Sequence, residues 1–77
     1  MSPIRFQKLD VREMIATGNE PFPVIRAVVN ALRPGSGLTV LAPFVPSPLI
    51  EKLKSEGFSV RLDRAGDGSW SVDFWRD

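Results

Sequence analysis

The residues best suited to chemistry lie in two short segments, Asp10-Val11-Arg12-Glu13 and Glu20-Pro21-Phe22-Pro23. The second segment leads into a predicted helix, and the start of a helix favours negative charge. A thiol there would be an activated nucleophile, but the chain has neither cysteine nor histidine. A carboxylate that stays ionised is a poor general acid. The sequence therefore predicts no catalytic residue and a protein that binds without reacting.

Glu20 has two interpretations. It can cap the helix together with Asn19, because side-chain oxygens at a helix start accept hydrogen bonds from the free amides. Alternatively, its carboxylate binds a cationic group on a partner or ligand. The first role is structural and the second functional, and the residue types alone leave both open.

Asp10 and Arg12 are two residues apart, so their side chains lie on the same side of an extended strand. Such a pair resembles an acid–base couple, but surface Asp–Arg pairs are usually structural. We therefore expect an ion pair that ties the strand end to the following loop. Glu13 brings a further carboxylate, but Arg12 competes for it, and no loop with Ca²⁺-type ligand spacing is present. We expect no metal site and no cofactor.

The loop Ala42-Pro43-Phe44-Val45-Pro46 is apolar at a position where connections normally face water. In one interpretation it extends a thin core. In the other it forms a docking edge, because ligands of open α/β sheets bind at the carboxyl ends of parallel strands. Glu20, Phe22 and Phe44 would then form one amphipathic patch.

Hydrophobic spacing predicts two helices and four strands. The strands cover 4–11, 37–42, 58–63 and 69–75, the helices cover 21–32 and a short stretch from Ser47 to Gly57, and 14–19 is a loop. Val24, Val28 and Leu32 form one helical row. Ser47 is expected to cap the second helix, and Gly66-Asp67-Gly68 to turn the final hairpin. The fold class is an α+β two-layer sandwich, β-α-β-α-β-β, with a four-stranded mixed sheet, two helices on one face and the other face bare.

The bare face should carry a mostly polar set of side chains. By alternation these are Phe6, Lys8, Asp10, Thr39, Leu41, Ser59, Arg61, Asp63, Ser71, Asp73 and Trp75. Phe6, Thr39 and Trp75 are expected near one end of the sheet. Trp75 is either ordinary surface or part of a dimer or partner surface. Nucleic-acid binding is unfavourable because acidic and basic residues alternate on this face.

Length and charge limit the remaining possibilities. The chain has 77 residues and a net charge of +1, which predicts one domain over 1–77 and no bulk attraction to nucleic acid or membranes. A stability of roughly 4–11 kcal/mol is expected for this size. The absence of an apolar stretch near 18 residues, or of a leader peptide, favours a cytoplasmic protein.

Several motifs together resemble the TusA-like (SirA-like) sulfur-carrier proteins of bacteria. They are Leu9-Asp10-Val11-Arg12, the prolines Pro21 and Pro23, and the helix exit Leu32-Arg33-Pro34-Gly35. Glu20 occupies the position of the family's cysteine. The resemblance covers about residues 8–75 and is closer still to an uncharacterised branch without the cysteine, which carries Pro-Leu where this chain has Pro48-Leu49. It implies the strand order 1-2-4-3, which also occurs in the C-terminal domain of bacterial translation initiation factor three.

The leading hypothesis is a non-enzymatic binding or regulatory domain that docks a protein partner or small ligand. The alternatives are an accessory protein in sulfur-transfer or redox metabolism, or RNA or DNA binding through the open sheet. The protein is expected to be a monomer or a weak homodimer.

Overall fold

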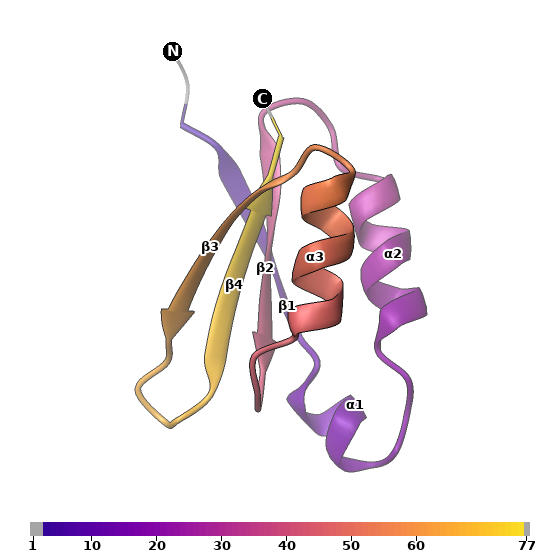
Figure 1. Ribbon diagram of the computed structural model, residues 1–77, viewed down its shortest axis with the longest axis vertical. Helices are drawn as coiled ribbons and strands as arrows, with labels where there is room; N and C mark the ends of the chain where they lie inside the picture. The colour runs from indigo at the N-terminus through magenta and orange to yellow at the C-terminus, as the bar shows by residue number, and fades with distance from the viewer. Residues whose placement is uncertain (1–2, 77) are drawn as a thin grey trace.

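The computed structural model describes residues 3–76 and contains four strands and three helices (Figure 1). In chain order they are β1 (Arg5–Asp10), α1 (Arg12–Ala16), α2 (Phe22–Asn30), β2 (Ser36–Ala42), α3 (Ser47–Ser55), β3 (Ser59–Arg64) and β4 (Trp70–Trp75). The sheet order is β1-β2-β4-β3, with β1 and β2 parallel and the other pairs antiparallel. The predicted α+β fold class and the strand order are confirmed.

The core lies between the two central strands and the two long helices. Leu38 and Val40 of β2 and Val72 and Phe74 of β4 are completely buried. The helices α2 and α3 lie side by side on one face of the sheet (Figure 1), and their buried residues are Ile25, Val29, Leu49 and Leu53. The apolar side chains of β2 and β4 are buried because these strands have a neighbour on each edge and helices above. Within residues 3–76, no helix combines the length and hydrophobicity needed to span a bilayer.

The prediction of a loop over 14–19 is wrong in part, because α1 occupies Arg12–Ala16. The Asp10 side chain accepts a hydrogen bond from the Arg12 amide at 3.0 Å, and the Ile15 amide donates to the Val11 carbonyl at 3.0 Å. Gly18 then adopts a φ of +81°, a conformation that glycine reaches without a Cβ clash. A single turn of helix is too short to show a hydrophobic period, so the pattern missed it.

The bounds of α2 and the capping of α3 differ from the prediction. The helix α2 runs from Phe22 to Asn30 rather than over 21–32, and Leu32 instead donates its amide to the Val29 carbonyl in a turn at 3.2 Å. Val24 is 38% exposed, whereas Val28 and Leu32 of the same predicted row are partly buried and pack against the core. Ser47 is the first residue of α3 and makes no capping hydrogen bond.

The edge strand β3 is more exposed than its alternating sequence predicted. It begins at Ser59, and Phe58 is buried just before it. Leu62 points to the helix side with Val60 but is 40% exposed. Since β3 lies at the end of the sheet order, Leu62 has a neighbouring strand on one side only.

The pairing register arranges the open face in three cross-strand rows. They are Phe6–Gly37–Trp75–Ser59, Lys8–Thr39–Asp73–Arg61 and Asp10–Leu41–Ser71–Asp63. Phe6 and Trp75 therefore lie in one row near the end of the sheet, as predicted, whereas Thr39 lies in the middle row. Leu41 and Asp73 are buried although this face has no helix, because both stand on central strands between paired neighbours.

Candidate binding pocket

A pocket of about 370 Å³ opens at the edge of the sheet where the parallel strands β1 and β2 end. It is bounded by α1, the starts of α2 and α3, and the loop after β2. We call it the apolar pocket; its lining consists of Val11, Ile15, Gly18, Asn19, Glu20, Pro21, Phe22, Ile25, Val40, Ala42, Phe44, Pro46, Pro48 and Leu49. The place is the one that open α/β sheets use for ligands.

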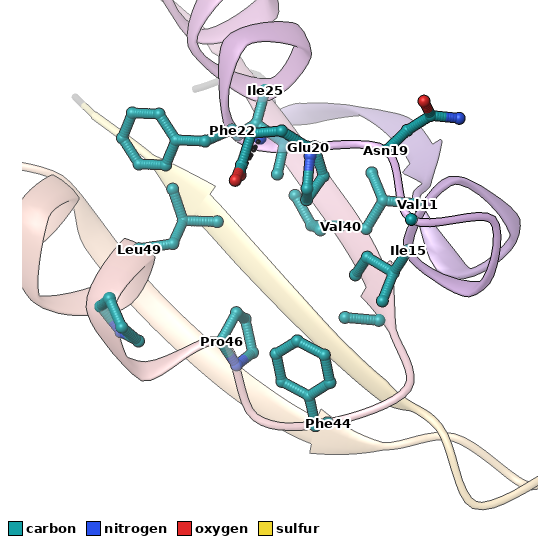
Figure 2. Close-up of a pocket in the computed structure, with 14 residues that line it drawn as sticks. Val11, Ile15, Asn19, Glu20, Phe22, Ile25, Val40, Phe44, Pro46 and Leu49 are labelled. Carbon is teal, nitrogen blue, oxygen red and sulfur yellow. Dashed lines mark hydrogen bonds between the residues drawn. The ribbon is translucent and has the colours of Figure 1, made fainter.

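The inner surface of the pocket is apolar. Val11, Val40 and Ala42 are almost fully buried. Ile15 and Leu49 lie on opposite sides of the opening in Figure 2. An occupant would gain free energy chiefly by removing its own apolar surface and that of the pocket from water.

Two phenylalanines stand at the mouth. Phe22 and Phe44 are 37% and 51% exposed, and Figure 2 shows them on opposite sides of the opening. The Arg26 guanidinium carbon lies 5.8 Å from the centre of the Phe22 ring. Arg26 also makes two hydrogen bonds of 2.7 Å to Glu56, which join α2 to the end of α3. Hydrogen bonding to Glu56 raises the pKa of Arg26, and the same bonds lower the pKa of the Glu56 carboxyl.

Among residues 3–76, Glu20 is the only ionisable side chain that lines the pocket. Its Oε1 atom accepts a hydrogen bond from the Phe22 amide at 3.2 Å, so the predicted capping contact is present. No residue among 3–76 hydrogen-bonds to its other carboxylate oxygen. Asn19 does not cap the helix, because its side-chain amide donates to the Thr17 hydroxyl at 3.0 Å.

The start of α2 has few amides left for an anion. The Phe22 amide is taken by Glu20, and Pro23 has no N–H. The negative charge of Glu20 therefore neutralises the partial positive charge at the start of α2, which faces the pocket. The local charge at the mouth is that of a carboxylate beside two aromatic rings.

Asp10 and Arg12 lie outside the lining of the apolar pocket and form the expected ion pair. Arg12 contacts both carboxylate oxygens, at 3.0 and 2.8 Å, and also binds Asp67 and the Ser69 hydroxyl, the latter at 3.2 Å. The hydrogen bond from the Arg12 side chain, with its amide second, lowers the pKa of Asp10 to about 2. The pair thus fastens the end of β1 to the β3–β4 turn, which is a structural role.

Trp75 also lies away from the pocket, on the open face. Its ring meets Phe6 edge to face with 6.0 Å between ring centroids, and the Arg61 guanidinium carbon lies 5.9 Å from its centre. In the neighbouring row, Asp73 accepts hydrogen bonds from Arg61 and from the Thr39 hydroxyl. The open face is therefore an internally paired surface, separate from the site at the helix starts.

Sequence reasoning missed α1 as a wall of the pocket and Arg26 as the support of Phe22. Val11 and Ile15 are four positions apart, the spacing of one helical turn, but one such pair is too little to predict a helix. The Arg26–Glu56 contact joins residues 30 positions apart, and nothing local in the sequence indicates it.

The comparisons with known proteins give one result. Residues 8–76 match the family described as "Uncharacterized conserved protein (DUF2249)". No curated protein and no solved structure matches the chain. Because the match covers most of the sequence, the chain belongs to this family.

Proposed function

We propose that this member of the uncharacterised conserved family is a non-enzymatic binding module, and that its apolar pocket docks a group that combines an apolar body with a positive charge. The single observation that carries the proposal is the convergence of Glu20, Phe22 and Phe44 on one pocket of about 370 Å³. The occupant could be a small organic cation or an apolar side chain of a protein partner next to a lysine or arginine.

The chemistry of the mouth supports a cation. A positive group can lie over the face of an aromatic ring, and Phe22 and Phe44 both stand there, beside the unengaged Glu20 oxygen. The Arg26 guanidinium already approaches Phe22, which illustrates this kind of contact. The apolar interior then provides the burial energy, while the carboxylate selects the sign of charge.

Two features of the pocket support binding rather than turnover. A general acid or base needs a partner that takes or gives the proton in a defined position, and within the described part of the chain no second ionisable side chain lines the pocket beside Glu20. The chain also has no cysteine to act as a nucleophile. We infer that Glu20 has a recognition role at the position where TusA-like carriers, to which we propose a distant relationship, hold their thiol.

One alternative keeps the same surface. In a sulfur-transfer or redox pathway, the domain would bind the partner of a carrier without carrying sulfur itself. This version is favoured by Pro21, which lines the pocket, and by Pro23 two positions later. Nucleic-acid binding through the open sheet has less support, since Asp73 already neutralises Arg61 there.

The proposal can be tested with two probes of similar shape and opposite charge. Amide NMR spectra of the protein would be recorded while 2-phenylethylammonium or 3-phenylpropionate is added at constant ionic strength. We expect saturable shifts around the pocket with the ammonium only. Glu20→Gln keeps an oxygen for the Phe22 amide but removes the charge, so it should fold normally and weaken ammonium binding by about tenfold, or about 1.4 kcal/mol.

The matched control is Glu13→Gln, which removes one charge from the neighbouring helix α1 without altering the pocket lining. It should bind the ammonium like the wild type, whereas Phe44→Ala should bind it more weakly. Equal shifts with both probes, or an unchanged affinity in Glu20→Gln, would contradict the cation preference. No shift around the pocket with either probe would contradict the binding role of the pocket.

A further inference from the structure

A group of arginines lies at the end of the molecule opposite to the apolar pocket. The chain has seven, and three of them, Arg12, Arg26 and Arg61, have a carboxylate within 4.0 Å. Within residues 3–76, the remaining four have none. One of these, Arg64, lies over the Trp70 ring at 5.3 Å.

The other three, Arg5, Arg33 and Arg76, line two small grooves at the end of the sheet where β1 and β2 begin. Arg5 and Arg33 line a groove of about 330 Å³, and Arg33 and Arg76 line one of about 100 Å³. The grooves share Leu32, Arg33 and Ser36, so they adjoin each other with Arg33 between them. We call them the arginine grooves. Among residues 3–76, none that lines these grooves is acidic.

Backbone contacts hold this end of the molecule together. The Arg5 amide donates to the Gly35 carbonyl at 3.0 Å, and the Ser36 amide donates to the Arg33 carbonyl at 3.0 Å. The Gly35 residue between them has a φ of +84°, which closes the tight turn after α2. The first strand and this turn therefore keep the backbones of Arg5 and Arg33 next to each other.

The third arginine is fixed by its side chain. The Arg76 guanidinium carbon lies 4.5 Å from the centre of the buried Phe58 ring, and one of its nitrogens is 3.4 Å from the Glu56 carbonyl. Stacking uses the face of a guanidinium and leaves its N–H groups at the edge available for an anion.

We propose that the arginine grooves bind the phosphate group of a small molecule. Three guanidinium groups from three separate segments offer more donors than the two oxygens of a carboxylate can use, whereas a phosphate dianion presents oxygens in several directions. Gln7 and Ser36 supply neutral donors in the larger groove, and Phe6 and Leu32 give it an apolar wall. The larger groove thus also has room for the organic part of a phosphate monoester.

The test uses two probes, inorganic phosphate and phenyl phosphate, with the ionic strength kept constant by sodium chloride because salt screens such contacts. Amide and arginine side-chain NMR signals should shift saturably at Arg5, Arg33, Ser36 and Arg76. Tighter binding of phenyl phosphate would identify a monoester as the ligand class, and equal binding would identify free phosphate; both support the phosphate site.

The double variant Arg5→Ala/Arg33→Ala should bind either probe at least about tenfold more weakly, since it removes two charged hydrogen-bond donors from the grooves. Arg33→Lys keeps the charge but loses the planar fork, and should also bind more weakly. Arg64→Ala is the matched control, because it removes an arginine without a carboxylate partner from the other end of β3, and it should bind like the wild type.

Two results would overturn the proposal: no saturable shift with either phosphate, or the same affinity in the double variant as in Arg64→Ala. The outcome is independent of the apolar pocket. Glu20→Gln should leave phosphate binding unchanged, and Arg5→Ala/Arg33→Ala should leave 2-phenylethylammonium binding unchanged, so failure of one proposal can be told from failure of the other.

Discussion

At the scale of single residues, Arg12 shows how one side chain can join distant parts of a small chain. It contacts Asp10 two positions away and Asp67 on the β3–β4 turn. The Asp67 carboxyl also has a lowered pKa, caused first by the Ser69 amide and then by the Ser69 side chain, with Arg12 adding to it. Such surface contacts stabilise a fold with so small a hydrophobic core, because each one limits the fraying of strand ends.

The Asp10–Arg12 pair predicts a specific acid sensitivity. The pKa of Asp10 is about 2 in the folded chain and about 3.9 when unfolded, so the pair stabilises the fold above pH 4 and this stability is lost as the pH falls from about 4 to 2. Asp10→Asn should lower the urea midpoint at pH 6 and flatten its decline between pH 4 and 2. The checks are urea denaturation curves over this range.

Glu51→Gln is the control for this experiment, because Glu51 is exposed on α3 and has no ion pair among the described residues. Its denaturation curves should follow those of the wild type. If Asp10→Asn declined as steeply as the wild type over pH 4 to 2, the carboxylate pair would not be the source of the acid sensitivity.

At the scale of elements, Gly37 in β2 determines how the open face is built. It lies between Phe6 and Trp75 in the first cross-strand row. A Cβ placed on it would lie 2.6 Å from the Phe6 ring and 2.8 Å from the Phe74 carbonyl oxygen. The missing side chain therefore provides the space in which Phe6 crosses β2 to reach Trp75.

Gly37→Ala should consequently destabilise the protein by about 1–3 kcal/mol, the usual cost of overpacking. The Phe6 ring can move, but the Phe74 carbonyl belongs to a buried central strand and cannot. Gly66→Ala is the matched control, since nothing lies within 4 Å of a Cβ at that position and no unusual φ is required. Thermal unfolding of both variants tests this, and equal melting temperatures would contradict it.

At the scale of the whole molecule, the two proposed sites lie at opposite ends of the sheet. The apolar pocket is at the carboxyl ends of β1 and β2, and the arginine grooves are at their amino ends. Between them lies one core that both sites share. In a domain with an expected stability of roughly 4–11 kcal/mol, a single core defect should affect both ends.

Leu53→Ala tests this dependence on the core. Leu53 is almost fully buried in α3, and truncating a buried leucine costs about 2–5 kcal/mol, a large part of the total. Leu62→Ala makes the same change at an exposed position of β3 and should cost far less. Chemical denaturation of the two variants measures the difference; similar losses would mean that the burial pattern does not control stability.

Much of the fold could be predicted from residue patterns. The apolar runs of β2 and β4, the helical spacing within residues 21–32, and the glycine turns near residues 35, 57 and 66–68 indicated the main elements. Local signals of this kind act over a few residues, which is why element types were correct while helix ends and the short α1 were not.

The sequence predicted several residues of the candidate site, but not the walls of the pocket that they line. Placing Glu20, Phe22 and Phe44 at strand ends followed from topology, and the structure brings all three to one pocket. Ile15 joined them only because α1 folds, and Arg26 supports Phe22 only because α2 and α3 meet. Asp10, Arg12 and Trp75, which the sequence also singled out, lie outside the lining of this pocket.

By itself, the sequence determined the chemistry available to this protein: no thiol, no imidazole, a carboxylate before the first long helix, and seven arginines. Only the tertiary structure decided which of these groups meet. It assigned three arginines to carboxylates and left three around the arginine grooves. Contacts such as Arg26–Glu56 and Arg12–Asp67 join residues 30 and 55 positions apart, and their free energy exists only when the packed core brings those residues together.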